Sequence, residues 1–92
     1  MTATVHALRR READRQQYLA CVRAAEAMRA DARRFRDLEE DLTADEAVYG
    51  SRAKDYRAGV LARIELVAGW CEAEAARMDE YADAYLPLLG VS

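Results

Sequence analysis

Residues 18–42, with the sequence YLACVRAAEAMRADARRFRDLEEDL, carry the pattern that decides the fold. Four side chains recur there at strict intervals of seven: Cys21, Met28, Phe35 and Leu42. Five more fill the same side at spacings of three and four: Tyr18, Val22, Ala25, Ala32 and Leu38. This spacing is typical of one apolar stripe on an α-helix. Residues 1–49 contain neither Gly nor Pro, so we expect a first helix over 4–41.

A second stripe with the same spacing lies between residues 60 and 85. Its members are Val60, Ile64, Val67, Cys71, Ala75, Met78, Ala82 and Tyr85. Pro87 disfavours helical geometry in the residue before it and so sets the end of this helix. The pattern predicts a second helix over 51–86.

Two signals between the helices leave the connection open. Thr43 and Glu46 have the spacing of a capping box, in which Thr43 would be the N-cap. Gly50 followed by Ser51 resembles a helix stop and a new N-cap. We favour a short helical turn at 44–49. The alternative is a tight turn at 42–43, with the second helix running unbroken.

The two connections predict different registers of the helices. The favoured one places Met28 opposite Ile64 and Cys21 opposite Cys71, whereas the tight turn places Cys21 opposite Ile64. Because the favoured register pairs apolar with apolar residues, it predicts that mild oxidation links Cys21 to Cys71 within one chain. In a reducing compartment we expect two free thiols.

Composition indicates one all-α domain over 1–92, an antiparallel helical hairpin. Hydrophobic residues make up 52% of the chain, but 20 residues are Ala, and there is one Phe and one Trp. Two helices with so few large apolar side chains bury little surface on their own. We therefore expect a homodimer that forms a four-helix bundle, a larger protein partner, or both.

Charge is distributed unevenly along the chain. The net charge is −3, which disfavours nucleic acid as the main partner. Residues 1–36 hold nine Arg and four acids, whereas 37–92 hold five basic and thirteen acidic residues. The basic clusters are Arg9, Arg10, Arg11 and Arg15, and then Arg33, Arg34 and Arg36. In a hairpin we expect this asymmetry to be neutralised by pairing between the two helices.

Residue types that support catalysis are scarce. His6 is the single histidine, and no Gly-rich phosphate loop occurs. Four helical carboxylates, Glu26, Glu65, Glu72 and Glu74, are expected to be solvated. We therefore expect no catalytic residue, no cofactor and no metal site. No apolar run is long enough to span a membrane and no apolar leader is visible, so we expect a cytoplasmic protein.

Several apolar residues lie off the two main stripes. Leu66 and Trp70 are four apart, with Arg63 on the same flank, and Leu8 and Leu19 lie off the stripe of the first helix. These five residues are the expected partner interface, because Trp is enriched at interface hot spots. The sequence thus predicts a non-catalytic interaction module. Such a bacterial or phage protein would be an adaptor, an assembly subunit or a stoichiometric inhibitor, for example antitoxin-like.

The segment from Val48 to Tyr56 resembles the turn of the WXG100 (ESAT-6-like) family. Tyr49-Gly50 stands at the connection, and an aromatic, Tyr56, follows the Gly six residues later. The resemblance implies a helical hairpin exported without a leader by type VII secretion. Val48 stands where the family has Trp, and Tyr81 is followed four residues later by Tyr85 instead of the acidic residue of the family's export signal. A nucleic-acid-binding helical protein is the third expectation, based on the two Arg clusters.

Overall fold

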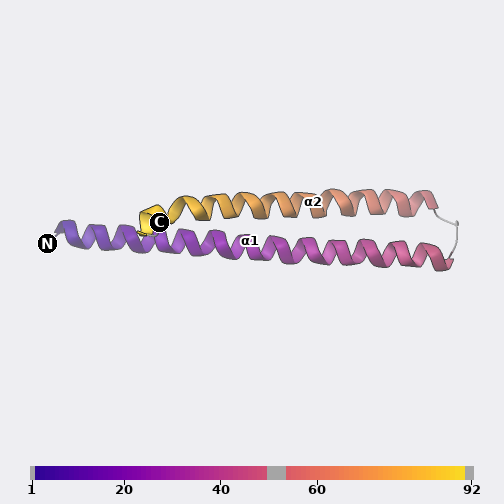
Figure 1. Ribbon diagram of the computed structural model, residues 1–92, viewed down its shortest axis with the longest axis horizontal. Coiled ribbons are helices and arrows are strands. Elements are labelled where there is room, and N and C mark those ends of the chain that lie inside the picture. Colours follow the sequence, from indigo (N-terminus) through magenta and orange to yellow (C-terminus); the bar gives the residue numbers. More distant parts are fainter. Residues whose placement is uncertain (1, 50–53, 91–92) are drawn as a thin grey trace. The chain divides into compact units, whose positions relative to one another are not determined.

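The computed structural model describes residues 2–49 and 54–90, and the side chains of 4–44 and 54–90. It contains two long helices, α1 (Thr2–Tyr49) and α2 (Lys54–Tyr85), followed by a 3-10 turn, η1 (Pro87–Leu89). The helices pack against each other as an antiparallel hairpin, with no strand in the described ranges (Figure 1). The all-α hairpin predicted from the two stripes is therefore confirmed. None of the described helices combines the length and the apolar character needed to cross a membrane.

The end of α1 differs from both predicted connections. The helix runs to Tyr49, eight residues beyond the expected end at 41, so there is no separate turn at 44–49 and no tight turn at 42–43. Thr43 is not an N-cap, because its Oγ1 donates a 2.8 Å hydrogen bond to the carbonyl of Glu39 one turn earlier. Without Gly or Pro before position 50, continuing the helix satisfies the backbone as well as the capping box would. The Gly50-Ser51 stop lies outside the described residues, as does the expected start of the second helix at 51.

The end of α2 follows the prediction closely. Pro87 occupies the first position of η1, where its missing N–H costs nothing. Gly90 closes this turn with a left-handed φ of 78°, and its N–H donates a 3.1 Å hydrogen bond to the Pro87 carbonyl. A left-handed residue at this place is readily supplied by Gly. Leu88 and Leu89 are thereby held beside the last turn of α2.

By packing, the chain divides into two units. Unit 1 comprises Met1–Ala27 and Glu74–Ser92, and unit 2 comprises Met28–Ala73. Each unit contains a stretch of both helices, and the prediction of a single domain over 1–92 stays a prediction.

The register of unit 2 is given by one arginine. Arg36 of α1 binds Glu65 and Glu72 of α2. The favoured register would have placed Arg36 opposite Tyr56, so the observed contacts lie nine and sixteen residues further along α2. The tight-turn register lies further still from what is observed. Both registers are wrong for one reason: α1 continues to Tyr49, which moves every facing pair.

Small residues form most of the core. The buried residues are Ala25, Ala32, Ile64, Ala68, Cys71, Ala75 and Ala82. Two expected stripe members are wrong: Leu38 and Val67 are 45% and 40% exposed, whereas Ala68, next to Val67, is fully buried. Alanines at intervals of seven allow the backbones of two helices to approach closely, which favours Ala over larger side chains at the contact. No large side chain is fully buried in the described part of the chain.

The cysteines do not occupy the positions that the favoured register required. Cys21 lies in unit 1, in a groove with Tyr81, Ala84 and Tyr85, while Cys71 is buried in unit 2, and both thiols are free. The observed register therefore does not place Cys21 opposite Cys71, as the predicted disulfide required.

We now expect that mild oxidation of the folded protein leaves no intramolecular bridge between Cys21 and Cys71. Thiol titration should also show Cys71 reacting more slowly than Cys21, because Cys71 is only 4% exposed and Cys21 is half-buried. Mass spectrometry of the tryptic digest measures both. A linked peptide containing both cysteines, obtained from folded monomer, would contradict the observed register.

Candidate interaction surface

One face of α2 in unit 2 is apolar and open to solvent. We call it the α2 outer face and define it by six exposed residues: Gly59, Ala62, Leu66, Gly69, Trp70 and Ala73. Leu66 is 73% exposed and Trp70 57% exposed. Both were predicted interface residues, and in the single chain neither belongs to the core.

The α2 outer face arises from two apolar patterns on one helix. The residues that pack on α1 include Ile64, Ala68 and Cys71. A second series recurs at spacings of three and four on the other side: Gly59, Ala62, Leu66, Gly69 and Ala73. A helix that is apolar on two sides buries one of them against its hairpin partner and leaves the other uncovered. Sequence reasoning found Leu66 and Trp70, with Gly59 on the same flank, but missed Ala62, Gly69 and Ala73, although their spacing is visible in the sequence.

The two glycines of this face have no packing role within the chain. A Cβ placed on Gly59 or on Gly69 would meet nothing within 4 Å. Each Gly inside a helix costs about 0.5–1 kcal/mol relative to Ala. The packing of α2 on α1 therefore does not require Gly at either position. Because these two residues have no side chain, the α2 outer face is flat on either side of Leu66.

The other predicted interface residues divide between the two units. Arg63 is exposed and lies beside the α2 outer face, with exposed Val67 on the same flank. Leu8 and Leu19 belong to unit 1, where they line a groove on α1. The five residues predicted as one interface thus belong to two surfaces.

A charged cluster joins the helices in unit 2. Arg36 Nη2 lies 2.6 Å from Oε1 of Glu72, and its Nη1 binds Glu65 and lies 3.6 Å from Oε2 of Glu39. Glu65 and Glu72 are exposed, as expected from the sequence, and the register in addition brings both of them to Arg36. By binding two glutamates of α2, Arg36 determines the register of the two helices. Exposed ion pairs of this kind contribute little to the free energy of unfolding.

The carboxyls of the cluster have displaced pKa values. A hydrogen bond to Glu65, partial burial and repulsion by Glu65 raise the pKa of Glu39 above its ordinary value. The hydrogen bond from Arg36, together with that from Glu39, lowers the pKa of Glu65. Glu39 therefore takes up a proton at a higher pH than Glu65 does.

We expect Glu39→Gln to raise the melting temperature at neutral pH. The raised pKa means that ionised Glu39 opposes folding once the pH exceeds this pKa, and Gln removes that opposition. The advantage should shrink as the pH falls through the raised pKa, since the wild-type carboxyl then becomes neutral. Thermal melts by circular dichroism between neutral pH and pH 4 measure it.

Glu65→Gln is the matched control and should act in the opposite direction. The pKa of Glu65 is lower in the folded chain than in the unfolded chain, so its ionised carboxylate stabilises the fold above the pKa of the unfolded state. This stabilisation is lost as the pH falls through the pKa of the folded state. A Glu39→Gln variant that is less stable than wild type at neutral pH would show that the carboxyl is held by Arg36 and not repelled by Glu65.

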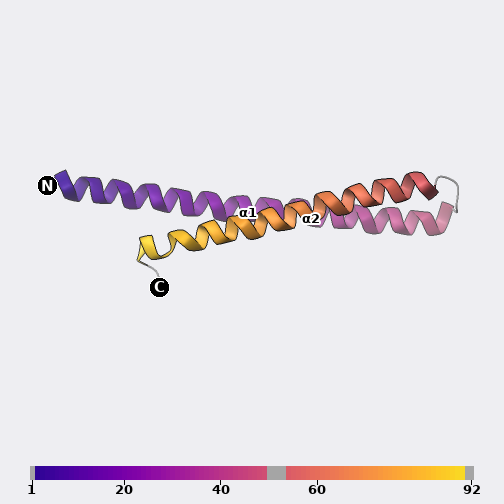
Figure 2. The same cartoon turned by 90° about the horizontal axis from the view of Figure 1, so that it is seen from above.

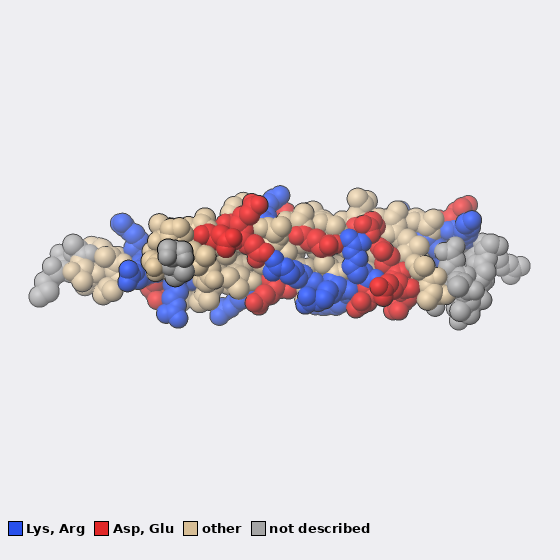
Figure 3. Space-filling model, viewed as in Figure 1, with Lys and Arg blue, Asp and Glu red and all other residues tan. Residues whose placement is uncertain are grey.

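The basic clusters are only partly paired. Arg34 pairs with Asp31 and Arg36 with the cluster above, whereas Arg9, Arg10, Arg11 and Arg15 pair with no acid among residues 4–44 and 54–90. Figure 3 shows basic and acidic side chains intermingled along much of the displayed face. The expected neutralisation between the helices therefore does not extend to the first cluster.

Within the described residues, no group of three or more His, Cys, Asp or Glu side chains could hold a metal ion. Comparisons with models of protein families, with curated proteins and with solved structures find no match to this chain.

Proposed function

We propose that this protein is a non-catalytic interaction module that docks the α2 outer face on another helical protein, in the first place a second copy of itself. The observation that carries the proposal is the exposure of Leu66 and Trp70 at the centre of an uncharged face. Trp is among the residues most enriched at interface hot spots, and contiguous apolar surface of this kind marks sites of association.

The glycines indicate what shape of partner fits. Gly59 and Gly69 leave space on each side of Leu66, and the series of small residues repeats at spacings of three and four. Helices approach each other closely along such a seam, as ridges fit into shallow grooves. A second helix therefore fits the α2 outer face better than a loop or an extended strand does, and two copies of the hairpin would form a four-helix bundle.

An adaptor, an assembly subunit and a stoichiometric inhibitor would all use such a face in the same way. What they share is that binding, and not chemistry on a small substrate, is the activity of the protein.

The experiment is light scattering after size exclusion at micromolar concentration. We expect a mass near twice 10.4 kDa, which decreases on dilution. A monomer at every concentration, combined with a cooperative melt, would reject self-association.

A further inference from the structure

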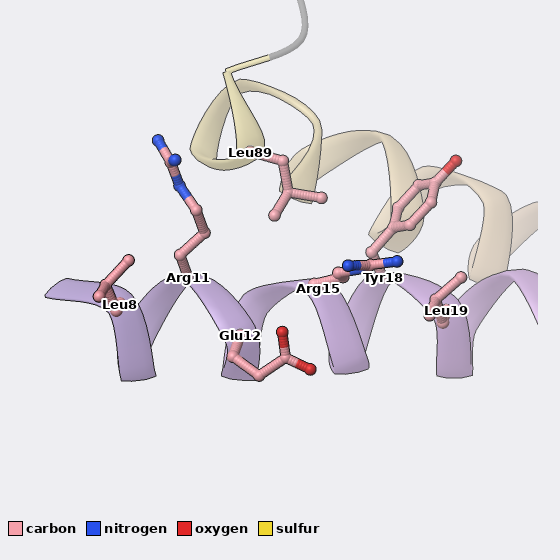
Figure 4. A pocket seen from close by; sticks show the side chains of 7 residues that line it. All are labelled: Leu8, Arg11, Glu12, Arg15, Tyr18, Leu19 and Leu89. Atoms are coloured by element: carbon pink, nitrogen blue, oxygen red, sulfur yellow. The ribbon is translucent and has the colours of Figure 1, made fainter. Parts of the chain in front are cut away.

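Among the residues that the structure describes, no helix packs along the first turns of α1. Within unit 1, α2 ends at Tyr85 and η1 follows, while the first turns of α1 continue beyond them (Figures 1 and 2). The side of this segment where α1 meets η1 is hollowed. Seven residues line a groove of about 400 Å³, which we call the N-terminal groove: Leu8, Arg11, Glu12, Arg15, Tyr18, Leu19 and Leu89 (Figure 4).

The floor of the N-terminal groove is apolar. Tyr18, Leu19 and Leu89 are half-buried, and Leu8 is 61% exposed. Leu89 of η1 points toward α1 between Arg11 and Tyr18 (Figure 4). A neighbouring groove of about 360 Å³ shares Leu8 and Arg11 and adds Leu88, which is 59% exposed. An apolar ligand surface would therefore find several leucine side chains here.

The rim of the groove is basic. Arg11 and Arg15 line it and Arg10 lines its neighbour, and none of the three pairs with an acid within the described ranges. Of the nearby acids, Glu12 accepts a 2.9 Å hydrogen bond from Gln16, and Asp14 is half-buried. The groove thus combines leucines with Arg11 and Arg15, which form no ion pair within the described ranges, and with one carboxylate, Glu12.

We propose that the N-terminal groove binds an acidic amphipathic α-helix of a partner protein. The apolar floor fits the leucine-rich side of such a helix, and the unpaired arginines fit carboxylates that flank this side. The ligand would lie where a longer α2 would have continued along α1. A nucleic acid fits less well, since its phosphates would leave the exposed leucines uncovered. This site is independent of the α2 outer face.

The test uses a fluorescein-labelled synthetic helix about three heptads long, with Leu at its a and d positions and Glu at e and g. A second peptide has Lys in place of every Glu. Fluorescence anisotropy should show that the acidic peptide binds the wild-type protein and that Arg11→Glu with Arg15→Glu weakens binding about tenfold or more. The doubly substituted protein should in turn bind the Lys peptide better than wild type does.

A control variant carries the same change of charge outside the groove. Arg9→Glu with Arg23→Glu alters two exposed residues that do not line it, and it should bind the acidic peptide within about twofold of wild type. Circular dichroism confirms that both variants remain helical. Equal binding of the two peptides, an equal loss in the control, or displacement of the peptide by a single-stranded oligonucleotide or by anionic vesicles at lower concentration would overturn the proposal.

Discussion

Replacing Leu66 and Trp70 together by Ala should convert the associated protein to monomer at concentrations where the wild type is assembled. Both side chains are exposed in the single chain, so their loss removes little from the hairpin itself. Truncating a buried hot-spot residue at an interface costs about 2 kcal/mol or more, which weakens association at least about 30-fold. Light scattering across a dilution series measures the change, and circular dichroism should show nearly unchanged helix content.

The matched control is Leu38→Ala, which truncates a 45% exposed leucine on α1. It should associate as the wild type does, because it lies outside the α2 outer face. If the double variant instead associates normally but loses most of its thermal stability, Leu66 and Trp70 are part of the core and the proposed interface is wrong.

Ala68→Leu should have the largest effect on stability. Ala68 is fully buried in unit 2, and it lies between the two glutamates that Arg36 binds. Three additional carbon atoms cannot fit there unless the helices separate, and overpacking of this kind costs about 1–3 kcal/mol. In a domain of this size each kcal/mol lowers the melting temperature by about 4–8 °C.

Ala20→Leu provides the comparison, because Ala20 is exposed. The same change there should alter stability by no more than about 0.5 kcal/mol. Equal melting temperatures for the two variants would show that the alanine seam is not closely packed.

Much of the fold could be predicted from the spacing of apolar residues. The intervals of three and four in both stripes correctly indicated two long helices, and Pro87 correctly indicated where the second one ends. The connection could not be predicted in the same way. Thr43 has the spacing of a capping residue, but its hydroxyl is equally satisfied by the Glu39 carbonyl within a continuous helix. Because the end of the first helix was predicted at the wrong residue, the predicted register of the two helices was wrong as well.

The exact core was harder to predict than the helices. Hydrophobicity favoured Val67 and Leu38, yet Ala68 is buried and both larger residues are exposed, because close packing of the two helices selects small side chains. Whether Arg9, Arg10 and Arg11 pair with acids of α2 depends on how far α2 extends along α1, and composition does not predict that extent. The candidate interface was partly visible: Trp70 and Leu66 stood off the stripe, but the role of Gly59 and Gly69 needed the structure.

The most direct test of the proposed interface is the fluorescence of Trp70, the single tryptophan of the chain. Its emission and its quenching by acrylamide should be followed while the protein is diluted from the micromolar range, where association is expected, toward the monomer. We predict a blue-shifted, protected indole in the assembled protein and a red-shifted, quenchable one in the monomer, because the single chain leaves Trp70 57% exposed. An emission spectrum and a quenching constant that remain those of an exposed indole, while light scattering shows a dimer, would place the interface elsewhere and contradict the account.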